Sequence, residues 1–246
     1  MRELTLEEKV QRALDYQEVQ NVMSKHMYLY GACKHQEEID QCWAMKQPDV
    51  RWTYNGCVYE GEDFIKFYVT GWEDRIMAHQ EEVAKWYPAE VVMENAGMGS
   101  IRAHVQTTPI IEIAGDGKTA KGVWYSNGLC AWIDGNTGKP FSANVWEKYG
   151  VDFIKEDGQW RIWHLSHYWD FALPTGKSMA DIQWPDTKDP RPQWTNDFNG
   201  NNRMKGLEFT RYTDGEIYKQ YHPMRVPQLM PKLPEPYETF DPNDAY

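Results

Sequence analysis

The chain has 246 residues, of which 41% are hydrophobic and 26% charged, a balance that is ordinary for a globular protein. Its formal net charge of −11 excludes the basic surface that nucleic-acid binding uses, so we expect no nucleic-acid partner. No window approaches eighteen apolar residues, and the charged N-terminus has no apolar stretch behind it; we therefore expect no membrane partner and a cytoplasmic location.

Helical patterns fill the first part of the chain. A helical start over residues 3–8 leads into residues 14–30, where apolar and amphipathic side chains recur at three- and four-residue spacing and predict a long helix with one buried face. A short second helix is predicted over 36–43, and a strand over 49–54. After Gly61, residues 62–72 predict a third helix that continues into 74–84.

From Ile101 the hydrophobic period changes to two. Strands are predicted over 101–114, 120–132, 141–155 and 160–169, with glycine- and asparagine-containing turns at 115–117, 134–136 and 157–158. Successive antiparallel hairpins after a helical first part indicate an α+β fold. We expect a strongly curved, mainly antiparallel sheet wrapped around the N-terminal helices.

The amino-acid composition of the chain changes after Leu173. Residues 174–202 are rich in proline and asparagine, prolines recur over 223–236, and apolar residues are too sparse for a second core. We expect one domain over 1–173 and a long irregular extension over 174–246 that packs against that domain or a neighbouring subunit and helps close its pocket. Eight of its aromatic residues in particular would be costly to leave exposed: Trp184, Trp194, Phe198, Phe209, Tyr212, Tyr218, Tyr221 and Tyr237.

Two stretches resemble SnoaL-like proteins of the nuclear transport factor 2-like superfamily. They are residues 108–125, reading TPIIEIAGDGKTAKGVWY, and residues 157–162, reading DGQWRI. With the opening helix through Tyr28, the resemblance covers roughly the first 170 residues. It implies a conical half-barrel with a pocket for a small hydrophobic molecule.

Within that family the chain is most similar to cofactor-free lyases, namely bile-acid 7α-dehydratases, scytalone dehydratases and the diarylpropane lyases that release formaldehyde from lignin fragments. The resemblance places Tyr28 and His104 at catalytic tyrosine and histidine positions. Cys33 stands where the related dehydratases have an aspartate. A further acid that the family would have is replaced near Asn127, and Trp169 stands where the family has an arginine on the last strand. These departures favour a flatter, aryl-bearing substrate over a steroid.

Catalytic roles are expected for three residues. His104 suits a general base because its pKa lies near neutrality, and the alternative is a buried structural histidine. Tyr28 can donate a hydrogen bond to a substrate oxygen, and the alternative is simple packing. On the last strand, alternation from Trp169 places His167 and Trp163 inward and His164 outward; a one-residue slip would exchange the two histidines.

Aromatic residues are abundant, at 14% of the chain, and suit a pocket for a ring-containing ligand or a subunit interface. The four cysteines form no C-x-x-C pair, no histidine pair has metal-ligand spacing, and no phosphate-binding loop occurs, so we expect neither metal nor cofactor. A homo-oligomer, dimer or trimer, is expected. The expected substrate contacts are Trp43, Tyr54, Phe64, Trp124, Asn127, Trp163 and Trp169.

The function that fits best is a cofactor-independent lyase. It would act by acid–base proton transfer on a hydrophobic hydroxylated aromatic compound and release formaldehyde or water. The alternatives are a steroid or bile-acid type of dehydratase and a non-catalytic binding module, since this fold also serves as a carrier scaffold. A ketosteroid type of isomerase needs a carboxylate base, and the sequence pattern indicates no inward-facing acid.

Overall fold

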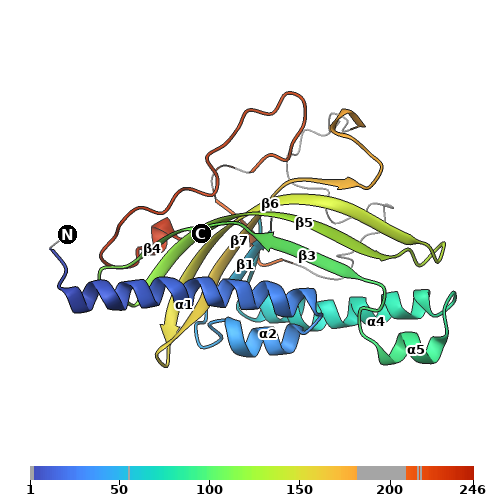
Figure 1. Ribbon diagram of the computed structural model, residues 1–246, viewed down its shortest axis with the longest axis horizontal. Helices are drawn as coiled ribbons and strands as arrows, with labels where there is room; N and C mark the ends of the chain where they lie inside the picture. The colour runs from blue at the N-terminus through green and yellow to red at the C-terminus, as the bar shows by residue number, and fades with distance from the viewer. Residues whose placement is uncertain (1–2, 55, 182–208, 215, 217) are drawn as a thin grey trace.

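The computed structural model describes residues 3–54, 56–181, 209–214, 216 and 218–246. Its helices are α1 (Leu6–Gly31), α2 (His35–Cys42), α3 (Glu62–Ile65), α4 (Gly71–Val83) and α5 (Ala89–Glu94), with a π-helical turn over Lys66–Thr70 between α3 and α4. Helices α1, α2, α4 and α5 lie along one side of a large curved sheet (Figure 1). None of the described helices is long and apolar enough to cross a membrane.

The sheet has eight strands: β1 (Arg51–Tyr54), β2 (Cys57–Glu60), β3 (Ile101–Gln106), β4 (Ile110–Ile113), β5 (Thr119–Ile133), β6 (Pro140–Glu156), β7 (Gln159–Pro174) and β8 (Arg211–Tyr212). Their order is β3-β5-β6-β7-β1-β2-β8, and β4 pairs with β5 beside β3. All pairings are antiparallel except that of β1 with β7. The predicted α+β fold with a curved, mainly antiparallel sheet is confirmed.

Helix α1 begins at a complete capping box. The Thr5 hydroxyl accepts a hydrogen bond from the Glu8 backbone, and the Glu8 carboxylate accepts one from the Thr5 backbone. These bonds satisfy backbone N–H groups that a helix start leaves without partners. The buried face of α1 then follows residues spaced by three or four, from Asp15 through Val19 to His26, and packs against β3, β4 and β7.

The predicted elements differ from the structure in several places, and the two-residue strand β8 also has no predicted counterpart. The strand predicted over 101–114 is two strands, because the chain leaves the ladder at 107–109, where Pro109 has no N–H to donate. Strand β7 continues five residues past the predicted end at 169. Strand β2 and helix α5, both short, are not among the predicted elements.

Alternation along β6 separates the two faces of the sheet. Val145, Tyr149 and Val151 are buried on the concave face toward the helices, which we call the inner face. Residues of opposite parity, such as Lys148 and Asp152, point to the outer face. Two register shifts in the β6–β7 pairing, at Trp146/Glu147 and Asp152/Phe153, each leave one extra residue in β7.

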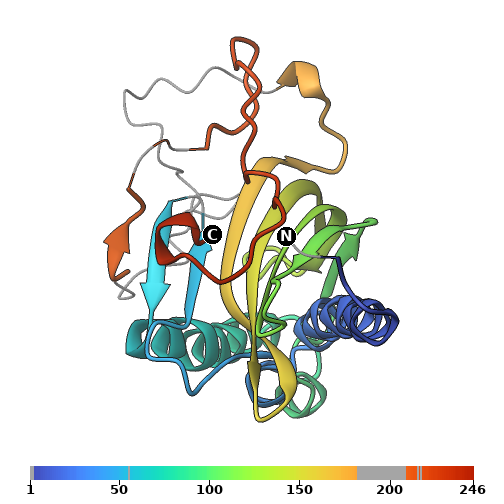
Figure 2. The ribbon, with the colours of Figure 1, turned by 90° about the vertical axis from the view of Figure 1, so that its left-hand side faces the viewer.

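The C-terminal segment lies across the outer face, on the side of the sheet away from α1 and α2 (Figures 1 and 2). The backbone N–H groups of Gly115 and Asp116 donate to the carbonyl oxygens of Tyr237 and Glu238, at 2.8 and 3.0 Å. Phe209 packs instead against the inner core. Trp184, Trp194 and Phe198 lie outside the described residues. These contacts support, as a proposal, the division into a domain over 1–173 and a wrapping extension over 174–246.

Candidate functional site

Glu147 is the centre of a polar cluster on the inner face. It occupies an inward position of β6 and is fully buried, at 0% exposure. Strand register places Ser126 of β5 on one side of it and Trp169 of β7 on the other. A carboxylate at this depth is stable only when charged or polar partners surround it.

Two histidines and a tyrosine supply those partners. His104 Nδ1 lies 2.5 Å from Glu147 Oε1, and His167 Nε2 lies 2.6 Å from Glu147 Oε2. The Tyr149 hydroxyl donates to Oε1. Because a carboxylate only accepts, each histidine nitrogen that faces it carries a proton. We call His104, Glu147, Tyr149 and His167 the inner cluster.

The two histidines have opposite pKa shifts although they share one carboxylate. Burial lowers the pKa of His104, but the charge of Glu147 and hydrogen bonds with Cys130 and Glu147 raise it well above its ordinary value. Burial also lowers the pKa of His167, and there it outweighs the attraction of Glu147. For Glu147, burial raises the pKa, but the two histidines bring it well below its ordinary value. At neutral pH His104 is therefore charged and His167 neutral.

Aromatic rings enclose the inner cluster. Tyr30, at the end of α1, meets the His104 ring edge-on at a centroid distance of 5.5 Å. Tyr54 and Trp169 meet the His167 ring at 4.7 and 6.1 Å. These surroundings strengthen electrostatic interactions within the inner cluster because they keep water away from it.

Polar atoms without protein partners lie on the same face. Gln106 stands opposite Ser126 in the β3–β5 register, and Ser126 stands opposite Glu147 in the β5–β6 register. The side-chain amide atoms of Gln106 and the hydroxyl of Ser126 are buried and have no hydrogen-bond partner among the described residues. An unsatisfied buried polar group costs about 1–3 kcal/mol, so these atoms are candidates for contact with a bound molecule.

The structure brings four of the predicted site residues together around Glu147. They are Tyr54, His104, His167 and Trp169. His167 faces inward as predicted, and His164 lies on the outer face. The roles of the four residues stay predictions.

Tyr28 lies elsewhere. Its side chain is 86% exposed, because it follows the buried His26 by two residues and therefore points away from the sheet. Tyr30, four residues after His26, shares the buried face and contacts His104. The placement of Tyr28 in the site was wrong by half a helical turn, and Tyr30 is the α1 tyrosine at the inner cluster.

Trp163 also lies elsewhere, because one of the two β-bulges reverses the alternation of β7. Asp152 pairs with His164 but Phe153 with Ile162, so Trp163 is the extra residue. Ile162 is buried in the inner core, while the Trp163 indole donates to Asp49 and packs on Phe240 of the C-terminal segment. Counting back from Trp169 by twos crosses this bulge and gives the wrong face.

Four further predicted contacts have no contact with His104, Glu147 or His167 among those that the structure gives, although Trp124 stands opposite Tyr149 in the β5–β6 register. Trp43 and Phe64 pack together in the core at 4.6 Å, and Trp124 packs on Phe153 at 5.9 Å. Asn127 is exposed, since it stands opposite Trp146 on the outer face. The first three are core residues and the fourth is a surface residue.

A second buried carboxylate, Glu38 of α2, was also missed. It accepts from His26 at 2.6 Å, from the Tyr68 hydroxyl at 2.8 Å and from the Trp43 indole at 3.0 Å. Burial raises the pKa of Glu38, but His26 and the other donors lower it to about 2. This group ties α1, α2 and the π-helical turn together, and the Tyr30 ring lies between its neighbour His35 and His104 of the inner cluster.

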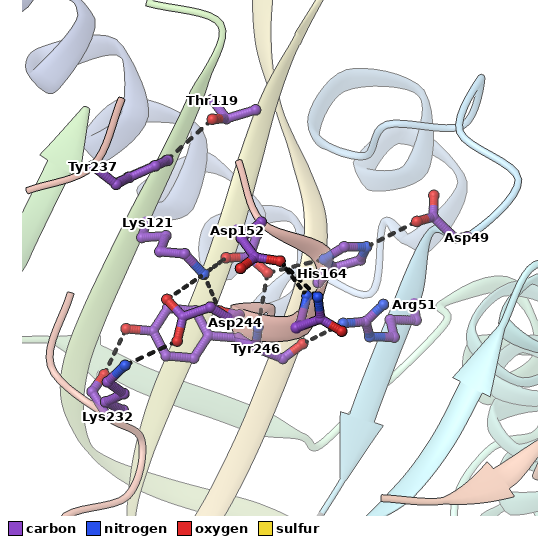
Figure 3. Close-up of polar contacts among 12 residues, drawn as sticks. Asp49, Arg51, Thr119, Lys121, Asp152, His164, Lys232, Tyr237, Asp244 and Tyr246 are labelled. Atoms are coloured by element: carbon purple, nitrogen blue, oxygen red, sulfur yellow. Dashed lines mark hydrogen bonds and ion pairs between the residues drawn. The ribbon is translucent and has the colours of Figure 1, made fainter. Parts of the chain in front are cut away.

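The outer face carries a polar group of its own, shown in Figure 3. Asp152 accepts from Lys121 and His164, both at 2.9 Å, and from the backbone of Tyr246 at 2.8 Å. Arg51 donates to the Tyr246 carbonyl at 2.8 Å. A cavity of about 530 Å³ adjoins these residues between the sheet and the C-terminal segment, and no predicted site residue lines it. These contacts hold the C-terminal segment.

The described residues contain no group of three or more His, Cys, Asp or Glu side chains arranged to hold a metal ion. In the inner cluster, hydrogen-bond distances of 2.5 and 2.6 Å join the carboxylate directly to its histidines. The geometry is therefore suited to the movement of protons between these side chains and a bound molecule.

Residues 11–166 match a family model described as a SnoaL-like domain. The structure is similar to the crystal structure of LinA, with 14% identity, 73% of this chain and 99% of that chain covered, and a TM-score of 0.47. It is similar to a hexachlorocyclohexane dehydrochlorinase, LinA-type3 from Novosphingobium barchaimii LL02, with 14% identity, the same coverage and a TM-score of 0.46. An NTF2-like protein with a cystatin-like fold from Novosphingobium aromaticivorans has 15% identity, coverage of 75% and 99%, and a TM-score of 0.41. No curated protein matches the sequence significantly.

Proposed function

Because the chain belongs to the SnoaL-like domain family, we propose that it is a cofactor-independent lyase that releases water or formaldehyde from a hydrophobic hydroxylated aromatic compound. The observation that carries this proposal is that His104 and His167 bond the two oxygens of buried Glu147, with pKa values shifted in opposite directions. Two titratable groups whose pKa values are pushed apart form an acid–base pair at one pH.

The proposed roles follow from the two protonation states. Neutral His167 takes a proton at Nδ1, the nitrogen that does not face Glu147, and charged His104 gives one from Nε2. In a dehydration, His167 removes a C–H proton, its electron pair forms the double bond, and His104 protonates the departing hydroxyl group. In a loss of formaldehyde, His167 removes the O–H proton of a hydroxymethyl group, and His104 protonates the carbon that keeps the electron pair.

The surroundings support an aromatic substrate with hydroxyl groups. Tyr30, Tyr54 and Trp169 present rings around the two histidines, and rings of a ligand pack favourably against such side chains. Gln106 and Ser126 offer buried donors and acceptors for a hydroxyl or phenol group. A site built to bond a hydroxyl discriminates strongly against a molecule that lacks it.

Glu147 corrects the expectation that no acid faces inward, but it does not favour the isomerase. The carboxylate accepts three hydrogen bonds, and its pKa is held well below its ordinary value by the two histidines. A carboxylate in that state is a weak base, since proton transfer to it is unfavourable near neutral pH. Its contribution is to orient the two histidines and to stabilise the charge on His104.

The test is a screen of hydroxylated diaryl compounds and steroids with the purified protein, in which mass spectrometry detects loss of the elements of water or of formaldehyde. We expect turnover of a diaryl compound, and a loss of about a hundredfold or more in His104→Asn and His167→Asn, the scale of general acid–base groups. His79→Asn is the matched control, because His79 bonds the Ile133 carbonyl in a helix away from the inner cluster. Turnover that survives in both cluster variants, or no turnover in the panel, would contradict the proposal.

A further inference from the structure

Cys130 stands next to the inner cluster and has no part in the proposed proton transfers. It lies on β5, and its sulfur is 3.7 Å from His104 Nε2, the nitrogen on the far side of the ring from Glu147. The order of groups is thus thiol, imidazole, carboxylate. A histidine oriented by a third group, with a thiol within reach, is the arrangement that activates nucleophilic cysteines.

Charged and titratable groups approach Cys130 from three neighbouring elements. Arg102 stands directly opposite it in the β3–β5 register, and His104 follows on the same face of β3. Glu147 approaches from β6 and is already bonded to both histidines, and Tyr30 approaches from α1. The His104 ring therefore lies within reach of the sulfur, while the nearest carboxylate is already bonded to both histidines.

A second observation indicates that a molecule binds along the inner face of the same strand. Ser126 lies on the inner face of the same strand, is fully buried, and has a hydroxyl without a partner among the described residues. Gln106 stands opposite it with a buried amide in the same condition. Gly128, between Ser126 and Cys130, cannot carry a side chain, because a Cβ there would lie 2.1 Å from the Ala103 carbonyl oxygen. Along its inner face, β5 thus presents the Ser126 hydroxyl, the bare backbone of Gly128 and the Cys130 thiol.

We propose that Cys130, with His104 and Glu147, is a nucleophilic centre that adds reversibly to conjugated aryl carbonyl compounds such as aryl enones. The thiolate forms a C–S bond at the β-carbon, the electron pair of the C=C bond moves toward the carbonyl group, and His104 delivers its Nε2 proton to the resulting enolate. The reverse steps return the enone, the thiolate and the imidazolium, so no oxidant or reductant is needed. This activity goes beyond the proposed lyase reaction and does not depend on it.

The first test measures the rate at which iodoacetamide alkylates each cysteine of the intact protein between about pH 6 and pH 8, by peptide mass spectrometry. A cysteine that is paired with a histidine reacts faster than an ordinary thiol, because the pair activates the nucleophile. We expect Cys130 to react faster than Cys33 throughout this interval, since His104 lies within reach of its sulfur. Cys33 is the internal reference, because it is also half-buried and free.

Two variants test whether the alkylation rate of Cys130 depends on His104 and Glu147. At about pH 6 the wild-type Cys130 should react roughly five- to tenfold faster than Cys33. In His104→Asn and in Glu147→Gln, the Cys130 rate should fall to that of Cys33, and circular dichroism should show the same fold.

The second test is incubation with 4-phenyl-3-buten-2-one. We expect an adduct on Cys130 that disappears on dilution and is absent in Cys130→Ser. A Cys130 alkylation rate no higher than that of Cys33, in the wild-type protein, would overturn the proposal. So would the lack of an enone adduct on Cys130. Neither result involves elimination of water or formaldehyde, so failure here is distinguishable from failure of the lyase proposal.

Discussion

Replacing Glu147 with glutamine is expected to lower kcat/KM by about a thousandfold, within the range measured for groups that control proton transfer. The amide keeps the shape of the carboxylate and still offers one oxygen to His104 and Tyr149, so the fold should survive. It removes the negative charge that holds the proton on His104. The measurement is kcat/KM as a function of pH, with a substrate from the screen.

The direction of the pH effect follows from the pKa shifts. The wild type needs protonated His104. Because the pKa of His104 is raised, activity should be lost only well above pH 6.5 as the pH rises. It also needs neutral His167, whose lowered pKa places the loss below pH 6.5 as the pH falls. In Glu147→Gln the burial of His104 is opposed only by its contact with Cys130, so activity should be lost at a lower pH on the alkaline side and the pH range of full activity should narrow.

The control for this prediction is Glu156→Gln on the same strand. Glu156 accepts from the Lys46 backbone and the Gln47 amide at the other end of β6, so its removal should leave the profile unchanged. An alkaline limb that stays in place in Glu147→Gln would show that Glu147 does not set the protonation of His104.

Replacing Asp152 with alanine is expected to lower the free energy of unfolding by about 3–5 kcal/mol. Asp152 is fully buried between Lys121 and His164, whose side chains are 4% and 1% exposed. Removing it leaves the Lys121 charge buried with one remaining acidic neighbour, Asp244, at 3.9 Å, and it removes the acceptor for the Tyr246 backbone. Urea unfolding followed by circular dichroism measures the loss.

Asp244→Ala is the matched comparison. Its carboxylate pairs with Lys232 at 2.9 Å but is 49% exposed, and exposed pairs contribute about 0–1 kcal/mol. Equal losses in Asp152→Ala and Asp244→Ala would mean that burial does not decide the strength of these contacts. A loss below about 1 kcal/mol in Asp152→Ala would contradict the anchoring role assigned to this residue.

The sequence predicted the fold class and most of the sheet, because alternation over strands of ten or more residues is a strong signal. β5 and β6 were predicted within one residue at each end, since glycine-containing turns bound them. β2 and α5 have 4 and 6 residues, and the hydrophobic periodicity of such short segments cannot be distinguished from that of loops. The family model over residues 11–166 agrees with the extent of the resemblance.

The candidate site was predicted only in part, because two local geometries override simple counting. The β-bulge at Trp163 changes the face of every residue before it on β7, and no residue type in that stretch marks it. The phase of α1 was taken from the family position of Tyr28 and not from the buried row that ends at Tyr30. An error of two residues on a helix turns a side chain to the opposite face.

Glu147 could have been found. It occupies the apolar phase of β6, between Val145 and Tyr149, so alternation alone places a carboxylate on the buried face. A charge in that phase implies a partner of opposite charge, and histidines on neighbouring strands are the candidates. Which histidines meet it depends on register and on the bulge, and neither is visible in one sequence.

The central claim is that Glu147 holds one histidine charged and one neutral at the same pH. The most direct measurement is an NMR titration of the ring signals of the seven histidines, assigned with His104→Asn and His167→Asn. We predict that the His104 signals keep their protonated shifts to well above pH 6.5, while those of His167 keep their neutral shifts to below it. Two histidines that titrate together near their ordinary pKa would contradict the account.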